Sequence, residues 1–229
     1  MRRIGIIGLG GIGSIVAPFL ARHLNYGLAG GWTIVLVDGD SYEERNGRRQ
    51  LFSALGGKAE VQVRDLAPRF TGVDFLAIPE FVTEENAGEV VREGDTVFLG
   101  VDNHRTRKVV SGRCERLDNV TLISGGNELT DGNVQVFMRR GGKDITPPLT
   151  HLHPEIANAP KVALGTAPGC PALAEQGQTQ LLLTNLGAAY LMLVAFYAIE
   201  TGGKPPFDEA YFDIMTGETR SVNRSGERN

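Results

Sequence analysis

Cysteine is scarce in this chain, whose 229 residues contain only Cys114 and Cys170. Two thiols cannot form a disulfide framework or a four-cysteine zinc site, so we expect a cytoplasmic location and no structural zinc. An excess of positive charge is also missing, because 23 Lys and Arg residues face 27 Asp and Glu residues and give a net charge of −4. This balance argues against DNA as a partner. The sequence G-x-x-x-x-G-K-[ST] is absent, which excludes a P-loop.

Long uncharged apolar segments are missing too, with one exception at residues 181–199. That segment is long enough for a transmembrane helix. However, Thr184, Asn185 and Gly187 interrupt it, and no cluster of Lys or Arg flanks it. We therefore interpret it as a fully buried core helix and expect no membrane association.

Apolar residues elsewhere switch between strand-like runs and helical spacing. We expect strands at 3–8, 32–37, 73–78, 96–101 and 120–124, and helices at 12–24, 48–70 with a break at Gly56-Gly57, and 104–117. The Asp131-Gly132 pair predicts a turn between strands at 127–129 and 134–138, and a final hairpin is expected at 211–222. Residues 141–176 contain many prolines and little periodicity, which predicts a long crossover loop.

This alternation predicts one α/β domain over residues 1–229. Its sheet should be Rossmann-like and mostly parallel, with an antiparallel extension and helices on both faces.

A glycine-rich turn lies between the first expected strand and helix. Its glycines are Gly8, Gly10, Gly11 and Gly13. Glycine lets the backbone turn tightly and approach a phosphate, while the start of the helix supplies N–H donors. Asp38 ends the second strand, where a carboxylate can accept hydrogen bonds from ribose hydroxyls. The pattern predicts an adenine-nucleotide site.

Further polar residues follow the second and fourth strands: Asp40, Asn46, Arg49, Gln50, Lys58 and Asp102. Activation of a carboxylate by ATP builds negative charge on phosphate oxygens. Arg49 can bind these oxygens with its planar guanidinium, and the flexible Lys58 can stay in contact with the leaving pyrophosphate. Asp102, at the end of a strand, is expected to hold Mg²⁺ against the phosphates. Asn46 and Gln50 are suited to fixing the ribose and phosphates. A solvated network of salt bridges is the alternative for the charged residues.

With the glycine turn, these residues resemble the ubiquitin-activating-enzyme superfamily, in its bacterial ThiF/MoeB/HesA adenylyltransferase branch. The shared pattern is G-x-G-G-x-G, D-x-D-x5-N-x2-R-Q, a lysine and a later aspartate, and it covers roughly the first 140 residues. The resemblance implies an ATP- and Mg²⁺-dependent enzyme that converts the C-terminal carboxylate of a small ubiquitin-like or sulfur-carrier protein, ending in Gly-Gly, into an acyl-adenylate. It also implies a homodimer, in which Arg2 or Arg3 is a candidate for reaching the partner's nucleotide.

Cys170 lies in Pro168-Gly169-Cys170-Pro171, in the loop where some relatives carry a thiol that accepts the acyl group. It is therefore a candidate acceptor thiol, and an inert cysteine is the alternative. Cys114 occupies an apolar helix position and is expected in the core. His151 and His153 could join Cys170 in a metal site, but solvent-exposed loop histidines are the alternative.

Two other functions remain open. A nicotinamide-dependent oxidoreductase would need only the glycine turn and Asp38, and would leave the other polar residues unexplained. A non-catalytic scaffold subunit of the same fold would be expected to lose the cationic residues, yet Arg49 and Lys58 are present. The resemblance also includes enzymes that act on a peptide C-terminus or a modified tRNA base, and the low net charge weighs against tRNA.

Overall fold

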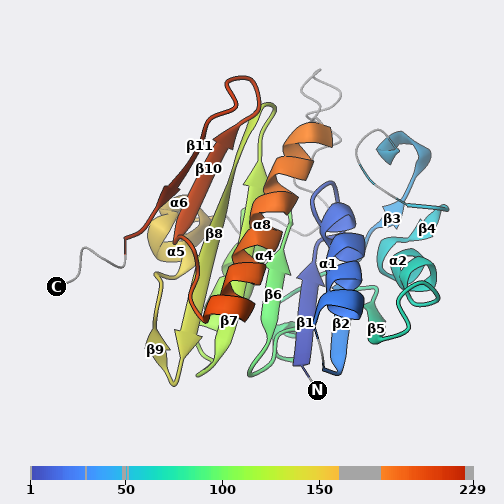
Figure 1. Cartoon of the computed structure of the whole chain (residues 1–229), viewed down its shortest axis with the longest axis horizontal. Coiled ribbons are helices and arrows are strands. Elements are labelled where there is room, and N and C mark those ends of the chain that lie inside the picture. The colour runs from blue at the N-terminus through green and yellow to red at the C-terminus, as the bar shows by residue number, and fades with distance from the viewer. Residues whose placement is uncertain (1, 29, 48–49, 51, 160–181, 225–229) are drawn as a thin grey trace.

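The computed structural model describes residues 2–28, 30–47, 50, 52–159 and 182–224 (Figure 1). Within this part of the chain, one sheet contains the strands β1 (Arg2–Ile7), β2 (Trp32–Val37), β5 (Val73–Ile78), β6 (Thr96–Leu99), β7 (Val120–Asn127), β8 (Asp131–Arg140), β9 (Lys143–Asp144), β10 (Glu209–Asp213) and β11 (Thr219–Val222). A separate small ribbon pairs β3 (Ser41–Tyr42) with β4 (Gly56–Gly57). The helices are α1 (Gly13–Gly27), the 3₁₀ turn η1 (Glu44–Asn46), α2 (Lys58–Leu66), α3 (Ala87–Val90), α4 (His104–Cys114), α5 (Leu149–Leu152), α6 (Pro154–Ala157) and α8 (Leu182–Gly202).

The strand order is β11-β10-β8-β7-β6-β1-β2-β5, and β9 pairs with β8. The pairs among β5, β2, β1, β6 and β7 are parallel. The pairs β7 with β8, β8 with β10, and β10 with β11 are antiparallel. The expected α/β fold, a mostly parallel sheet with an antiparallel extension, is confirmed.

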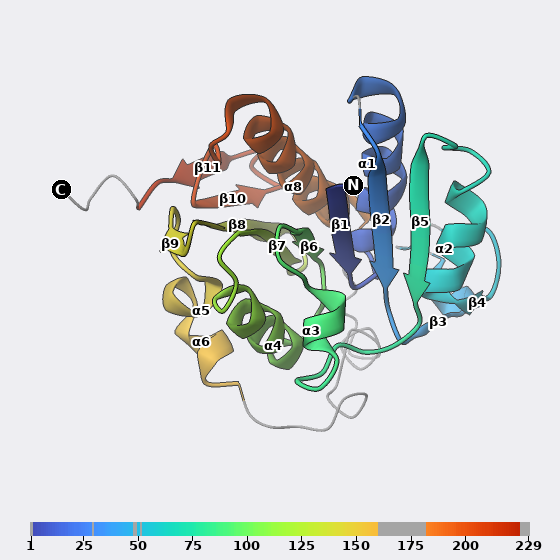
Figure 2. The ribbon, with the colours of Figure 1, turned by 90° about the horizontal axis from the view of Figure 1, so that it is seen from below.

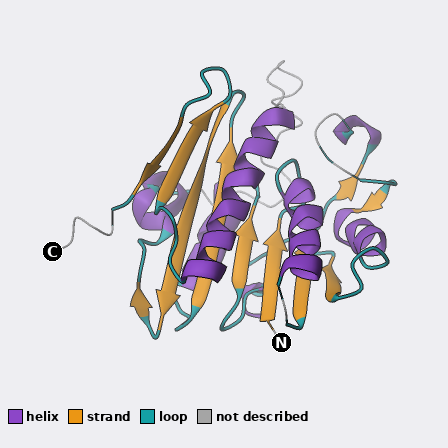
Figure 3. Ribbon diagram, in the orientation of Figure 1, coloured by secondary structure: helices purple, strands orange, loops and turns teal. Residues whose placement is uncertain are grey.

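Helices cover both faces of the sheet, as predicted (Figures 2 and 3). Because successive side chains of a strand point to opposite faces, each inner strand supplies two cores. Ile4 and Ile6 of β1 belong to a core that includes residues of α1, α2 and α8, whereas Ile7 belongs to a second core that includes residues of α3, α4, α5 and α6. Cys114 lies fully buried in the second core, which confirms its expected position.

The apolar segment forms α8, which packs against β7, β8 and α1. It is long and apolar enough to cross a membrane, and half of its most apolar window is buried inside the protein. The expectation of burial on all sides is wrong, because one side carries exposed apolar residues. These are Leu183, Leu186, Tyr190 and Tyr197, which are 45% to 64% exposed. Only the side that faces the sheet belongs to the core.

Three local expectations need correction. The break expected at Gly56-Gly57 is confirmed, because these residues pair as β4 with β3, but the described residues 50 and 52–55 before it are not helical, and α2 covers only Lys58–Leu66. The Asp131-Gly132 pair starts β8 instead of forming the turn, and β7 continues to Asn127. The segment expected as a loop contains β9, α5 and α6, while its residues 160–176 lie outside the described part of the chain.

Gly13 tests how tightly α1 is seated on the end of β1. A Cβ atom at Gly13 would overlap the carbonyl oxygen of Gly8, whereas a Cβ at Gly112 of α4 would meet open space. We expect Gly13→Ala to lower the free energy of unfolding by about 1–3 kcal/mol, as overpacking does. Gly112→Ala, the matched control, should raise it by about 0.5–1 kcal/mol because it removes a helical glycine. Urea unfolding of both variants measures the difference, and equal stabilities would contradict the close contact.

Candidate functional site

A cleft of about 750 Å³ opens where the parallel strands end. The predicted site residues that line it are Gly8, Gly10, Gly11, Asp38, Asp40, Asn46, Gln50, Lys58 and Asp102. Gly13 lies against Gly8 in the first turn of α1. Arg49 and Cys170 lie outside the described residues.

The sheet topology explains why these residues meet. β1 lies between β2 and β6, so the chain turns to opposite sides of β1 to form its two neighbours. Ligands of open α/β sheets bind at such a switch point, beyond the carboxyl ends of the strands. The glycine turn follows β1, Asp38 follows β2, and Asp102 follows β6, so all three reach the same edge of the sheet.

The glycine turn depends on close backbone contacts. The backbone angle φ of Gly8 is +86°, a conformation that residues with a Cβ atom rarely adopt. A Cβ on Gly11 would overlap the side-chain amide of Asn185, which α8 brings over the turn. The backbone of the turn therefore approaches both α8 and the cleft closely.

Asp38 ties the glycine turn to the end of β2. Its carboxylate accepts hydrogen bonds from the backbone N–H of Leu9 at 2.6 Å and of Asp40 at 2.8 Å. Burial raises the pKa of Asp38, while Lys58 and these two hydrogen bonds oppose the rise. A carboxylate has about four acceptor positions, so a ribose hydroxyl can still bind it.

Lys58 is the first residue of α2, and its side chain is only 8% exposed. Its Nζ lies 3.1 Å from Asp40 Oδ2 and 4.0 Å from Asp38 Oδ2. The Asp40 side chain is 57% exposed, and ion pairs with an exposed partner contribute little stability. An anionic ligand can therefore compete for the ammonium group at small cost.

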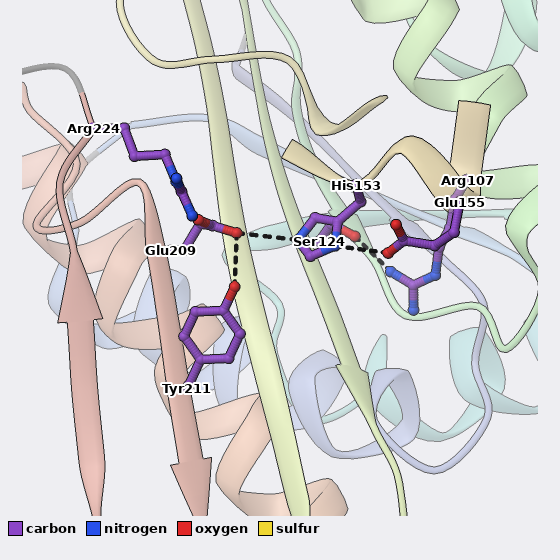
Figure 4. Close-up of polar contacts among 7 residues, drawn as sticks. All are labelled: Arg107, Ser124, His153, Glu155, Glu209, Tyr211 and Arg224. Atoms are coloured by element: carbon purple, nitrogen blue, oxygen red, sulfur yellow. Dashed lines mark hydrogen bonds and ion pairs between the residues drawn. The ribbon is translucent and has the colours of Figure 1, made fainter. Parts of the chain in front are cut away.

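Arg107 supports the loop that carries Asp102, and the sequence did not reveal it. Its guanidinium donates to Ser124 Oγ at 2.6 Å (Figure 4). It also donates to the backbone oxygens of Val101 at 2.6 Å and Gly125 at 2.7 Å. Burial lowers the pKa of Arg107 to about 10, and attraction to Asp102 opposes this fall. The one signal in the sequence that could have indicated this role is the position of Arg107, a basic residue four places after the helix cap Asn103.

Asn46 and Gln50 lie on the side of the cleft formed by η1. Asn46 Oδ1 accepts from the backbone N–H of Glu43 at 2.9 Å and so fixes the start of η1. Gln50 is buried, and its Oε1 has no hydrogen-bond partner among the described residues. A buried acceptor without a partner is costly, so Gln50 fits a ligand that donates a hydrogen bond.

One side of the cleft, here called the far wall, is lined by Asn133, Gln135, His153, Glu155 and Tyr211. Its arrangement depends on the buried Glu209 (Figure 4). Its carboxylate accepts from Tyr211 Oη at 2.9 Å and from Arg224 Nε at 2.7 Å, and it contacts His153 Nε2 at 3.0 Å. His153 Nδ1 also contacts Glu155 at 2.8 Å. His153, Glu155 and Tyr211 line the cleft, so Glu209 fixes the shape of this wall from behind.

Of the residues considered for other roles, His153 lines the cleft, Cys170 lies outside the described residues, and His151, Arg2 and Arg3 do not line the cleft. His151 is exposed on α5, and no group of three His, Cys, Asp or Glu side chains within the described ranges is arranged to hold a metal ion. Arg2 and Arg3 lie at the other end of β1 from the cleft. Arg3 pairs with Asp95 and donates to Val90 O at 3.0 Å.

Replacement of Glu209 by alanine tests the far wall. His153, Tyr211 and Arg224 would lose their common partner, so we expect the free energy of unfolding to fall by about 2–3 kcal/mol. Glu155→Ala removes an exposed carboxylate from the same network and should cost less than about 1 kcal/mol. Urea unfolding compares the two variants, and a Glu209→Ala protein as stable as Glu155→Ala would contradict this account.

Known proteins with similar sequences are longer than this chain. Adenylyltransferase and sulfurtransferase MOCS3 of Mus musculus is 27% identical over 194 residues, which are 81% of this chain and 40% of the relative. The sulfur carrier protein ThiS adenylyltransferase of Escherichia coli is 29% identical over 147 residues, which are 62% of this chain and 53% of the relative. The chain thus spans about half of the length of these curated relatives, or less.

The solved structure of E. coli MccB with ATP matches the fold with a TM-score of 0.71 and 20% sequence identity. The superposition covers 97% of this chain and 63% of that chain. The ThiF family model matches residues 1–202, which are most of the sequence. The chain therefore belongs to the ThiF family.

Proposed function

We propose that this protein is an adenylyltransferase that uses ATP and Mg²⁺ to activate the C-terminal carboxylate of a small ubiquitin-like or sulfur-carrier protein. The product would be an acyl-adenylate, with release of pyrophosphate. The observation that carries the proposal is the meeting of the glycine turn, Asp38, Lys58 and Asp102 in one cleft. The names of the two curated relatives, both adenylyltransferases, support it.

The nucleotide would lie across the ends of β1 and β2. The glycine turn and the start of α1 supply backbone N–H groups for phosphate oxygens. Asp38 would accept from the ribose hydroxyls, and the unpartnered Oε1 of Gln50 fits a donor on the ligand. Asn46 would add a further neutral hydrogen-bonding group.

The charge of the cleft supports a requirement for Mg²⁺. Among the described residues, eight that line the cleft carry a carboxylate: Asp38, Asp40, Glu43, Glu80, Asp102, Glu128, Asp131 and Glu155. Lys58 and Arg107 are its only Lys and Arg side chains in the described part of the chain. A triphosphate would need further positive charge, which Mg²⁺ supplies when held by Asp102 and the phosphates themselves. Arg49, which is expected from the sequence to bind the phosphates, would add to this positive charge.

The chemical step needs positioning and charge stabilisation. The acceptor carboxylate would attack the α-phosphorus in line, and pyrophosphate would leave with the electron pair of the broken bond. Lys58 would exchange its contact with Asp40 for the phosphate oxygens on which charge develops. Arg49 would hold these oxygens in a planar fork.

The acceptor chain would enter over the far wall, where Asn133, Gln135, His153 and Tyr211 line the same cleft. Their amide, imidazole and hydroxyl groups can pair with the backbone of an extended Gly-Gly tail. Cys170 remains the candidate thiol for a later acyl transfer. We place this activity in the cytoplasm.

We also propose that the protein is a homodimer, because the exposed apolar side of α8 is typical of a surface that is covered in an assembly. Tyr190→Lys would place a charge in the middle of this side and should shift the protein to monomers in sedimentation velocity. Lys204→Glu, a charge change just after α8, is the control. An unchanged dimer in the Tyr190→Lys variant would show that α8 is not at the interface.

Nucleotide selection and exchange test the proposed activity. ATP with Mg²⁺ should raise the melting temperature, whereas NAD should not. ATP–pyrophosphate exchange, measured with a panel of small carrier proteins that end in Gly-Gly, should fall about 100-fold or more in Asp102→Ala and in Lys58→Ala. Lys108→Ala, an exposed lysine on α4, is the control and should keep full exchange.

Other outcomes would separate the alternatives. Stabilisation by NAD and none by ATP would favour the oxidoreductase and contradict the proposal. Binding of ATP without exchange for any carrier would favour a scaffold subunit. Full exchange by Asp102→Ala would show that Asp102 does not hold Mg²⁺.

A further inference from the structure

Asn185 is an unusual residue for its place in the fold. It belongs to α8, whose sheet-facing side is otherwise largely apolar, and it is fully buried. Neither its Oδ1 nor its Nδ2 has a hydrogen-bond partner among the described residues. Buried side-chain amides nearly always form hydrogen bonds, so a buried amide whose oxygen and nitrogen both lack a partner requires an explanation.

The neighbour Thr184 makes the contrast clear. Thr184 is also fully buried, and its hydroxyl donates to Leu129 O at 2.8 Å. The two adjacent polar residues of α8 therefore differ, because one is satisfied within the protein and the other is not. A polar group that is retained without a partner in the protein is expected to find one in a ligand.

The position of Asn185 indicates which ligand. α8 begins at the edge of the sheet where the parallel strands end (Figure 1), and Asn185 lines the cleft. Its amide lies so close to Gly11 that a Cβ atom there would overlap it. Gly11 belongs to the turn that leads into α1, a helix of 15 residues whose first N–H groups favour an anion. An amide N–H beside this turn complements a phosphate oxygen.

We infer that Asn185 is a phosphate-binding residue, whose Nδ2 donates to an oxygen of the bound nucleotide over Gly11. This inference rests on the proposed function, and it adds to the site a residue from the distant α8. Asn185 would also couple α8 to the glycine turn, because nucleotide binding supplies the hydrogen bond that the protein alone does not.

The test uses the nearly isosteric variant Asn185→Leu in the full chain. Without nucleotide, its melting temperature should equal or exceed that of the wild type, because an apolar side chain replaces an unpaired buried amide. Its Kd for ATP with Mg²⁺, measured by calorimetry, should rise about 10-fold or more, since a hydrogen bond to a charged group is lost. The matched control Thr184→Val should show the opposite behaviour, with a lower melting temperature and an unchanged Kd.

A ligand series identifies the group that Asn185 binds. Loss of affinity for both ATP and AMP, with none for adenosine, would support a contact with the α-phosphate. Loss for ATP alone would support a contact with the outer phosphates. An equal loss for adenosine would overturn the phosphate assignment.

Two further results have separate meanings. If the wild type binds ATP and Asn185→Leu binds it equally well, the role of Asn185 is wrong while the proposed function stands. If the wild type binds no ATP, the proposed function itself fails. A lower melting temperature together with an unchanged Kd would make Asn185 a structural residue and would also overturn the inference.

Discussion

The hydrogen bond from the backbone of Leu9 to Asp38 is the contact on which the site depends. It fixes the glycine turn to the end of β2, and the second oxygen of the same carboxylate fixes Asp40. The side chain of Asp40 in turn forms an ion pair with Lys58. The buried carboxylate of Asp38 therefore orders the turn after β1, the end of β2 and the start of α2. Burial raises its pKa, which means that the protein holds this group where its charge is costly. Such a cost is typical of a functional site.

The side of the cleft at the ends of β1, β2 and β6 could be predicted because its residues lie next to strand ends along the chain. Gly8, Asp38 and Asp102 each follow a short apolar run, and parallel strands bring their carboxyl ends to one edge. The same reasoning predicted the parallel sheet and its antiparallel extension. Periodicity and motif spacing report on residues that are close in sequence, and the strand ends that form this side of the cleft can be located from such residues alone.

Residues that act through tertiary contacts could not be predicted in this way. Arg107 reaches Ser124 and Gly125 of β7, and Asn185 reaches Gly11 across most of the chain. The helix expected before the break at Gly56-Gly57 is absent from the described residues 50 and 52–55. The tertiary pairing of β4 with β3 could not be read from the sequence. Likewise, apolar composition alone cannot tell which side of α8 faces the sheet, so the helix was expected to be buried all round.

The two ends of the cleft differ in how they are built, and this difference bears on specificity. The far wall combines residues from β8, the α5–α6 segment and β10, which only folding brings together. Glu209 contacts both His153 and Tyr211, so these two side chains of the wall are held in place without a ligand. A wall fixed in this way selects its ligand by fit, because little ordering is left for the ligand to induce. In the proposed function, β8, β10 and the α5–α6 segment would therefore determine which acceptor fits, while the ends of the parallel strands would bind the nucleotide.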